Sequence, residues 1–115
     1  MPAFQLRSSR RDKQTDRERV RSVAKAIDAA MASAMKERAA LALRVTNAQD
    51  FAAFAVGNDS DEYLSRDPED TKRLAGYEQL LIAGHNRIAE LDIHIASLNA
   101  VRDVCLAQFR DQGAG

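Results

Sequence analysis

The sequence has few of the residues that interrupt helices and few that build a large core. Its 115 residues include 5 Gly, 2 Pro and no Trp, and only 5% are aromatic. The scarcity of Gly and Pro removes most turn signals, and runs of β-branched residues typical of strands are absent. Among the apolar residues 21 are Ala, which favours helix strongly but buries little surface. We therefore expect an all-α chain with narrow apolar stripes.

Cysteine and long apolar runs are also scarce. The single Cys105 excludes an internal disulfide, and its place on an apolar stripe predicts a buried structural thiol. No stretch approaches the roughly 18 apolar residues of a membrane span, and the first residues contain no apolar region of a secretory signal. We expect a cytoplasmic protein that does not enter a membrane.

The second half of the chain carries a strict alternation of three- and four-residue steps. The positions are Leu74, Tyr77, Leu81, Gly84, Ile88, Leu91, Ile95, Leu98, Arg102, Cys105 and Phe109. A mean spacing of 3.5 keeps one stripe of a long helix facing a partner helix. The pattern predicts a coiled-coil-like helix over about 68–112. Its start is marked by Asp67 as a cap, Pro68 in the first turn and two acids after it.

The first half carries the same spacing with smaller residues. The positions are Val20, Ala24, Ile27, Met31, Ala34, Arg38, Leu41, Val45, Ala48, Ala52 and Ala55. Thr15 and Glu18 fit a capping box, which predicts a helix over about 15–56, although Ser8 or Ser9 are alternative starts. Gly57 can end this helix by adopting the left-handed conformation.

These boundaries divide the chain into a flexible basic arm over 1–14, a single helical hairpin domain over 15–112 and a tail over 113–115. An acidic connector over 57–67 joins the two helices. Two helices of similar length with a short connector are expected to pair as an antiparallel hairpin.

The side of the second helix opposite its stripe is unusually apolar for a solvated surface. Its residues are Ile82, Ala89, Ile93, Ala96, Ala100 and Val104. An exposed helix face is normally rich in Glu, Lys and Gln. We expect this face to mediate self-association into a homodimer, an elongated four-helix bundle. The alternative is that Ala serves only as a helix former.

No motif for catalysis or ligand binding is present. The chain lacks a Gly-rich phosphate loop, a nucleophile elbow and a Cys-x-x-Cys pair. His85 and His94 fall on opposite sides of a helix, and residues 59–70 resemble a calcium loop but lack its central Gly. We expect no enzymatic activity, no cofactor and no metal.

Two further surfaces carry candidate partner sites. Around the hairpin tip lie Phe51, Phe54, Tyr63 and Leu64, which either plug the bundle end or dock another protein. Residues 1–25 hold eight Lys and Arg against three acids, although the net charge of the whole chain is zero. The candidate nucleic-acid contacts are Arg7, Arg10, Arg11, Lys13, Arg17 and Arg21.

The sequence thus predicts a small cytosolic adaptor, chaperone or assembly component. It would act as a helical protein–protein interaction module through an apolar helix face or the tip, with itself or another protein as partner. The alternative is a nucleic-acid-associated protein that uses residues 7–25. The acids Asp12, Asp16 and Glu18 interrupt that basic run and weigh against this alternative.

Overall fold

The computed structural model describes residues 2–58 and 68–114, with the side chains of 9–54, 68–108 and 110. These residues form two helices and no strand: α1 spans Pro2–Asn58 and α2 spans Pro68–Ala114. The all-α prediction is confirmed, and α2 begins at the expected residue with Glu69 and Asp70 in its first turn.

The start of α1 corrects the prediction of a non-helical arm followed by a helix at Thr15. The helix already includes residues 2–14, and the Oγ1 of Thr15 donates to the carbonyl of Arg11 at 2.9 Å. This bond to the preceding turn belongs to a helix interior, so Thr15 does not cap a helix. Residues 3–14 contain no Gly or Pro and several good helix formers, and Pro2 is tolerated in the first turn.

The C-terminal ends of both helices lie slightly beyond the predicted ones. Gly57 lies inside α1 and Gly113 inside α2, and no described residue has a positive φ. The predicted left-handed stop at Gly57 is therefore wrong, because this residue keeps ordinary helical backbone. Most of the predicted acidic connector, residues 59–67, lies outside the described part of the chain, and so does the predicted cap Asp67.

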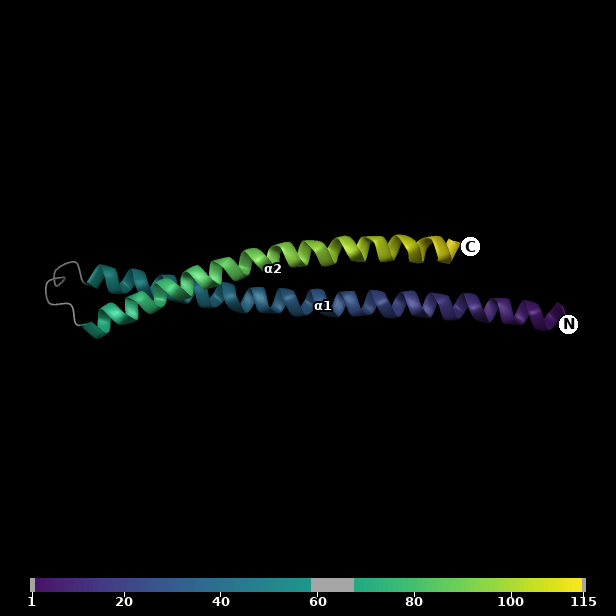
Figure 1. Ribbon diagram of the computed structural model, residues 1–115, viewed down its shortest axis with the longest axis horizontal. Coiled ribbons are helices and arrows are strands. Elements are labelled where there is room, and N and C mark those ends of the chain that lie inside the picture. The colour runs from purple at the N-terminus through teal and green to yellow at the C-terminus, as the bar shows by residue number, and fades with distance from the viewer. Residues whose placement is uncertain (1, 59–67, 115) are drawn as a thin grey trace. The chain divides into compact units, whose positions relative to one another are not determined.

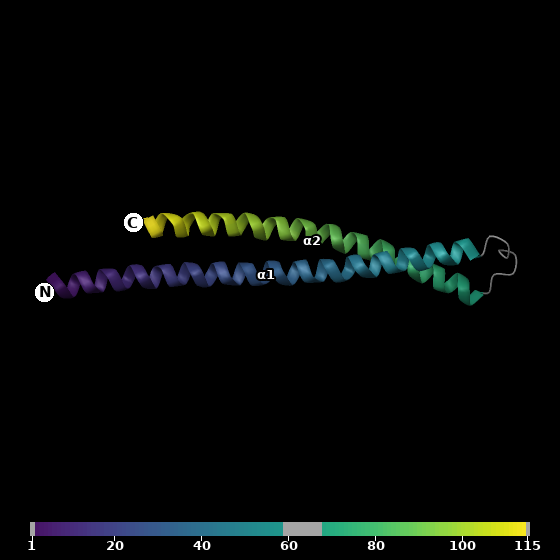
Figure 2. The ribbon, with the colours of Figure 1, turned by 180° about the vertical axis from the view of Figure 1, so that it is seen from behind.

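The chain divides into two compact units, and each contains a stretch of α1 beside a stretch of α2 (Figures 1 and 2). The first unit is Met1–Ala34 with His94–Gly115, and the second is Met35–Ile93. In the first unit Val20 contacts Cys105, and Asp28 further along α1 contacts Arg102 earlier along α2. In the second, Arg38 contacts Asp92 and Phe51 contacts Tyr77. The helices therefore pair antiparallel in both units, as predicted.

Both predicted stripes form the contact between the helices. Every stripe position whose side chain is described is buried or half-buried. Among the other described side chains, only those of Thr15, Arg17, Ala42, Leu106 and Ala107 are half-buried. The 3.5-residue spacing thus identified the seam between the helices correctly.

The core along this seam is thin. The buried apolar residues are Ile27 and Ala34 in the first unit, and Val45, Ala48 and Leu91 in the second. Among the described residues only Leu91 is a large side chain with almost complete burial, at 1% exposure. Full burial of a leucine contributes about 1.5–3 kcal/mol, so Leu91 is the strongest single apolar contribution in its unit.

A close approach of the helices in the second unit depends on Gly84. A Cβ atom built at this residue would lie 2.5 Å from the Cγ2 atom of Val45, well inside van der Waals contact. The missing side chain therefore lets α1 and α2 come together at this level of the seam.

Candidate protein-binding surface

In the second unit, α2 presents an apolar line on the side away from the seam. The side chains of Ile82 and Ile93 are 64% and 70% exposed, and Ala89 between them is also exposed. At 100° per residue these three positions fall within an arc of about 40°. Leu91, only two residues from Ile93, is fully buried. The same helix therefore has one apolar stripe inside the hairpin and a second one in contact with solvent.

In the first unit, the remaining residues of the predicted self-association face are also exposed. Ala96 and Ala100 face solvent, and the side chain of Val104 is 64% exposed. All six residues predicted for this face therefore lie at the surface. Whether they contact a second copy stays a prediction.

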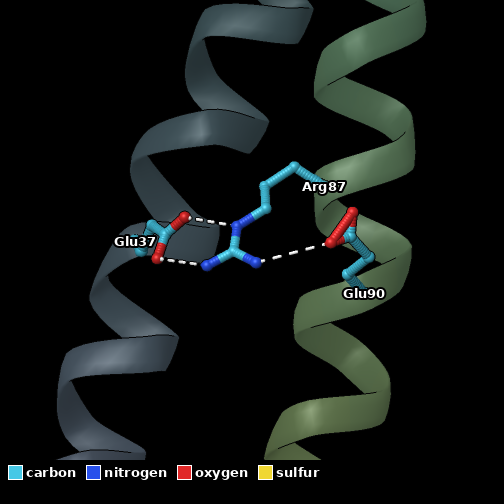
Figure 3. Close-up of polar contacts among 3 residues, drawn as sticks. All are labelled: Glu37, Arg87 and Glu90. Carbon is cyan, nitrogen blue, oxygen red and sulfur yellow. Dashed lines mark hydrogen bonds and ion pairs between the residues drawn. The ribbon is translucent and has the colours of Figure 1, made fainter.

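Ion pairs between α1 and α2 hold the second unit together beside this line. The guanidinium of Arg87 donates to both carboxylate oxygens of Glu37, from Nε at 2.7 Å and from Nη2 at 3.1 Å. Its Nη1 atom also lies 3.6 Å from Glu90 on the same helix (Figure 3). The hydrogen bond to Glu37 is the main cause that raises the pKa of Arg87, while desolvation opposes it.

A second bidentate pair joins Arg38 to Asp92. The Nε and Nη2 atoms of Arg38 donate to the two carboxylate oxygens of Asp92. This hydrogen bonding lowers the pKa of Asp92 and raises that of Arg38. Arg–carboxylate forks of this kind impose geometry as well as attraction. The two arginine–carboxylate pairs therefore define which residues of α1 and α2 lie opposite one another in this unit.

The first unit has a comparable polar contact on the seam. Arg102, a charged exception in the predicted stripe of α2, donates from Nε to Asp28 at 2.7 Å. Its half-buried stem covers the seam while its head group reaches a carboxylate on α1. Cys105, one turn further along, is half-buried and points its Sγ atom at the carbonyl of Val20, 3.8 Å away. The thiol therefore packs in the seam, although it is less buried than predicted.

These ion pairs are contacts of the site that the sequence analysis missed. The sequence analysis identified Arg38 and Arg102 only as positions of the two predicted stripes. The available signal was the charge at positions flanking the seam, where charges on paired helices form bridges that set orientation. Using that signal requires the register between the helices, which the stripes alone leave open.

The predicted docking tip is described only in part. The rings of Phe51 and Tyr77 lie with centroids 5.0 Å apart at 43°, so Phe51 packs partly against α2. Phe54 is 67% exposed, whereas Tyr63 and Leu64 lie outside the described residues. The contact of Phe51 fits a plug at the end of the seam, and Phe54 retains exposed aromatic surface.

The predicted basic contacts separate into groups on α1. Arg10, Arg17 and Arg21 line one hollow of about 320 Å³ together with Gln14 and Glu18. Arg11 and Lys13 are exposed but do not line it, and the side chain of Arg7 lies outside the described ones. The structure thus brings three of the six predicted residues together.

The His, Cys, Asp and Glu residues of the described chain form no metal-binding cluster. No group of three or more His, Cys, Asp and Glu among the described residues could hold a metal ion. The Nε2 atom of His85 lies 3.5 Å from the side-chain nitrogen of Gln49, and His94 is exposed. Within 2–58 and 68–114, neither helix has a segment long and apolar enough to cross a membrane.

Comparisons of the chain with models of protein families, with curated proteins and with solved structures found no match.

Proposed function

We propose that this chain is a helical protein–protein interaction module, a small non-enzymatic adaptor, chaperone or assembly component of the cytoplasm. Its first partner is a second copy of itself, with which it forms a four-helix bundle. The exposed apolar line of Ile82, Ala89 and Ile93 on α2 is the contact surface in the second unit.

The observation that carries this proposal is the exposure of Ile93 beside the buried Leu91. A helix that packs on one side only normally has polar residues on the other. Here the outer side keeps two isoleucines of which more than half the surface is in contact with water. Exposed apolar residues that line up on one face are typical of surfaces that bind another protein.

The chemistry of the surface suits a helix as partner. Burial contributes about 1.5–3 kcal/mol for each large aliphatic side chain, and the small Ala89 allows another helix to approach closely. The nearby carboxylates of Glu90 and Asp92 already pair with arginines of the same chain. A second helix that packs on the line therefore does not leave these charges without a counterion.

Light scattering on a sizing column tests self-association directly. We expect a mass near twice the 12.7 kDa of the chain, and a mass near one chain for the Ile93→Asp variant with its helical circular dichroism retained. Ser33→Asp, at an exposed position of α1, is the matched control and should keep the dimer mass. A wild-type protein with the mass of one chain contradicts self-association. Loss of helical signal in Ile93→Asp shows instead that Ile93 belongs to the hairpin core.

A further inference from the structure

The continuity of α1 through residues 2–14 changes how its charges are arranged. Along the sequence, Asp12, Asp16 and Glu18 interrupt the basic residues. On a helix, residues are placed by their angle around the axis and no longer by their order. The relevant question is therefore which charges share a face.

Five cations of α1 share one face in the first unit. At 100° per residue they fall within an arc of about 120° that is centred on Arg10. We name this set the basic face: Arg10, Lys13, Arg17, Arg21 and Lys25. All five are exposed except Arg17, which is half-buried.

The acids of the same segment lie outside this arc. Asp12 and Asp16 are each rotated more than about 90° from Arg10, and Asp16 pairs with Arg19 at 3.1 Å. Glu18 lies at the edge of the arc and accepts from Nε2 of Gln14 at 3.4 Å. The helix thus separates Asp12 and Asp16 from the cations, whereas Glu18 stays beside them and lines the same hollow as Arg10, Arg17 and Arg21.

We propose that the basic face binds the phosphate backbone of nucleic acid without reading its sequence. Arg10, Arg17 and Arg21 line one hollow of about 320 Å³ with Gln14 and Glu18, so three cations face one acid there. With a rise of 1.5 Å per residue, the five cations extend along about 22 Å of helix. At about 3.4 Å of DNA axis per phosphate of one strand, this length corresponds to about six phosphates. The guanidinium group of arginine can donate two hydrogen bonds to phosphate oxygens. α1 also continues beyond the C-terminal end of α2 in this unit (Figure 1).

The chemistry of the face favours nucleic acid over an anionic membrane. A helix that lies on a membrane needs large apolar residues next to its cations. Between residues 9 and 25 the large apolar residues are Val20 and Val23, and Val20 is half-buried in the seam, where its carbonyl accepts from the thiol of Cys105. The basic face therefore offers charge without an apolar surface that could insert.

Fluorescence anisotropy with a labelled duplex of mixed sequence, about 20 base pairs long, tests the proposal. We expect a plot of the logarithm of the binding constant against the logarithm of the salt concentration to have a slope of about −3.6 to −4.5, as for four or five phosphate contacts. The Arg10→Gln/Arg17→Gln variant should bind at least about tenfold more weakly and with a slope smaller by about 2.

The matched control is the Arg11→Gln/Arg19→Gln variant, which removes the same charge from the same segment but outside the basic face. It should bind almost as well as the wild type, and circular dichroism checks that both variants stay helical. An equal loss of duplex affinity in the two variants would overturn the proposal of a basic face. Binding would then depend on the total charge of the segment and not on the position of the cations. Absence of duplex binding at low salt, or binding to anionic phospholipid vesicles in its place, overturns the proposal. None of these outcomes depends on the mass that tests self-association.

Discussion

At the scale of single residues, packing at Gly84 and ion pairing at Asp92 decide the local structure of the second unit. The sequence analysis named Gly84 only as one position of the second stripe. In the structure this residue allows the close approach of the helices, because a Cβ atom there would overlap Val45. Asp92 has no feature in the sequence that separates it from other surface acids. Asp92 joins α2 to α1 because Arg38 of α1 lies opposite it and donates a hydrogen bond to its carboxylate.

We predict that Gly84→Ala and Gly76→Ala change stability in opposite directions. Both replacements gain about 1 kcal/mol of helix propensity. At Gly84 the new methyl group meets Val45, whereas at Gly76 it meets no atom within 4 Å. Overpacking costs about 1–3 kcal/mol, so Gly84→Ala should be less stable than Gly76→Ala by about that amount. Thermal unfolding followed by circular dichroism measures the difference, and equal melting temperatures would show that Val45 moves aside freely.

The ion pair of Asp92 predicts a contribution to stability that depends on pH. Because the hydrogen bond from Arg38 lowers the pKa of Asp92 in the folded chain, the pair stabilises the fold above the ordinary carboxyl pKa. This contribution is lost as the pH falls below about 4 and through the lowered pKa. The effect should be small, since both side chains are about half exposed to solvent.

Melting temperatures of wild type and Asp92→Asn across this acidic range check the prediction. We expect the two curves to differ at neutral pH and to converge in acid. Parallel curves would show that another carboxylate causes the acid dependence.

At the scale of elements, α2 has two apolar sides, of which one is buried against α1 and the other is exposed to solvent. Its inner stripe was correctly predicted from the 3.5-residue spacing, because burial against a partner helix requires this spacing in any antiparallel pair. The start at Pro68 was also predictable, because a proline followed by acids suits the first turn of a helix. The start of α1 was not, because a capping-box spacing also occurs inside helices, where Thr15 bonds back to Arg11.

The two sides of α2 predict different outcomes for the same substitution. Leu91→Asp puts a charge into the most buried position of the described seam and should cost at least about 3 kcal/mol, enough to unfold the hairpin. Ile93→Asp places the charge in water and should leave the helices intact. Helical circular dichroism and thermal melts of the two variants measure this contrast. A Leu91→Asp variant as stable as the wild type would show that the seam is assigned to the wrong residues.

At the scale of the whole molecule, the described residues provide a thin core and much exposed apolar surface. Five apolar residues are buried, and two of these are alanines. Ten large apolar residues are exposed, among them Met35, Leu43 and Val101. A partner that covers this exposed apolar surface and binds only the folded state would stabilise the chain.

We therefore predict that the melting temperature of the wild type rises with protein concentration. Folding coupled to self-association obeys mass action, so more of the chain is dimeric and protected at higher concentration. The Ile93→Asp variant should lose this dependence, and Ser33→Asp should keep it. Circular dichroism melts over a dilution series are sufficient for the measurement. A wild-type melting temperature that does not change with concentration would remove self-association as a source of stability.

The sequence by itself determined the helical class, the antiparallel pairing and the two stripes of the seam. These follow from helix propensity and from the spacing of apolar residues, which are local properties of the chain. Tertiary structure decided which residues of α1 and α2 lie opposite one another, and hence the pairs Arg38–Asp92 and Glu37–Arg87 and the contact of Gly84 with Val45. The same stripes can pair in more than one register, and only packing and charge pairing across the seam select among them. The continuous helix likewise decided which cations of residues 10–25 share a face, since that depends on helical angle and not on order in the chain.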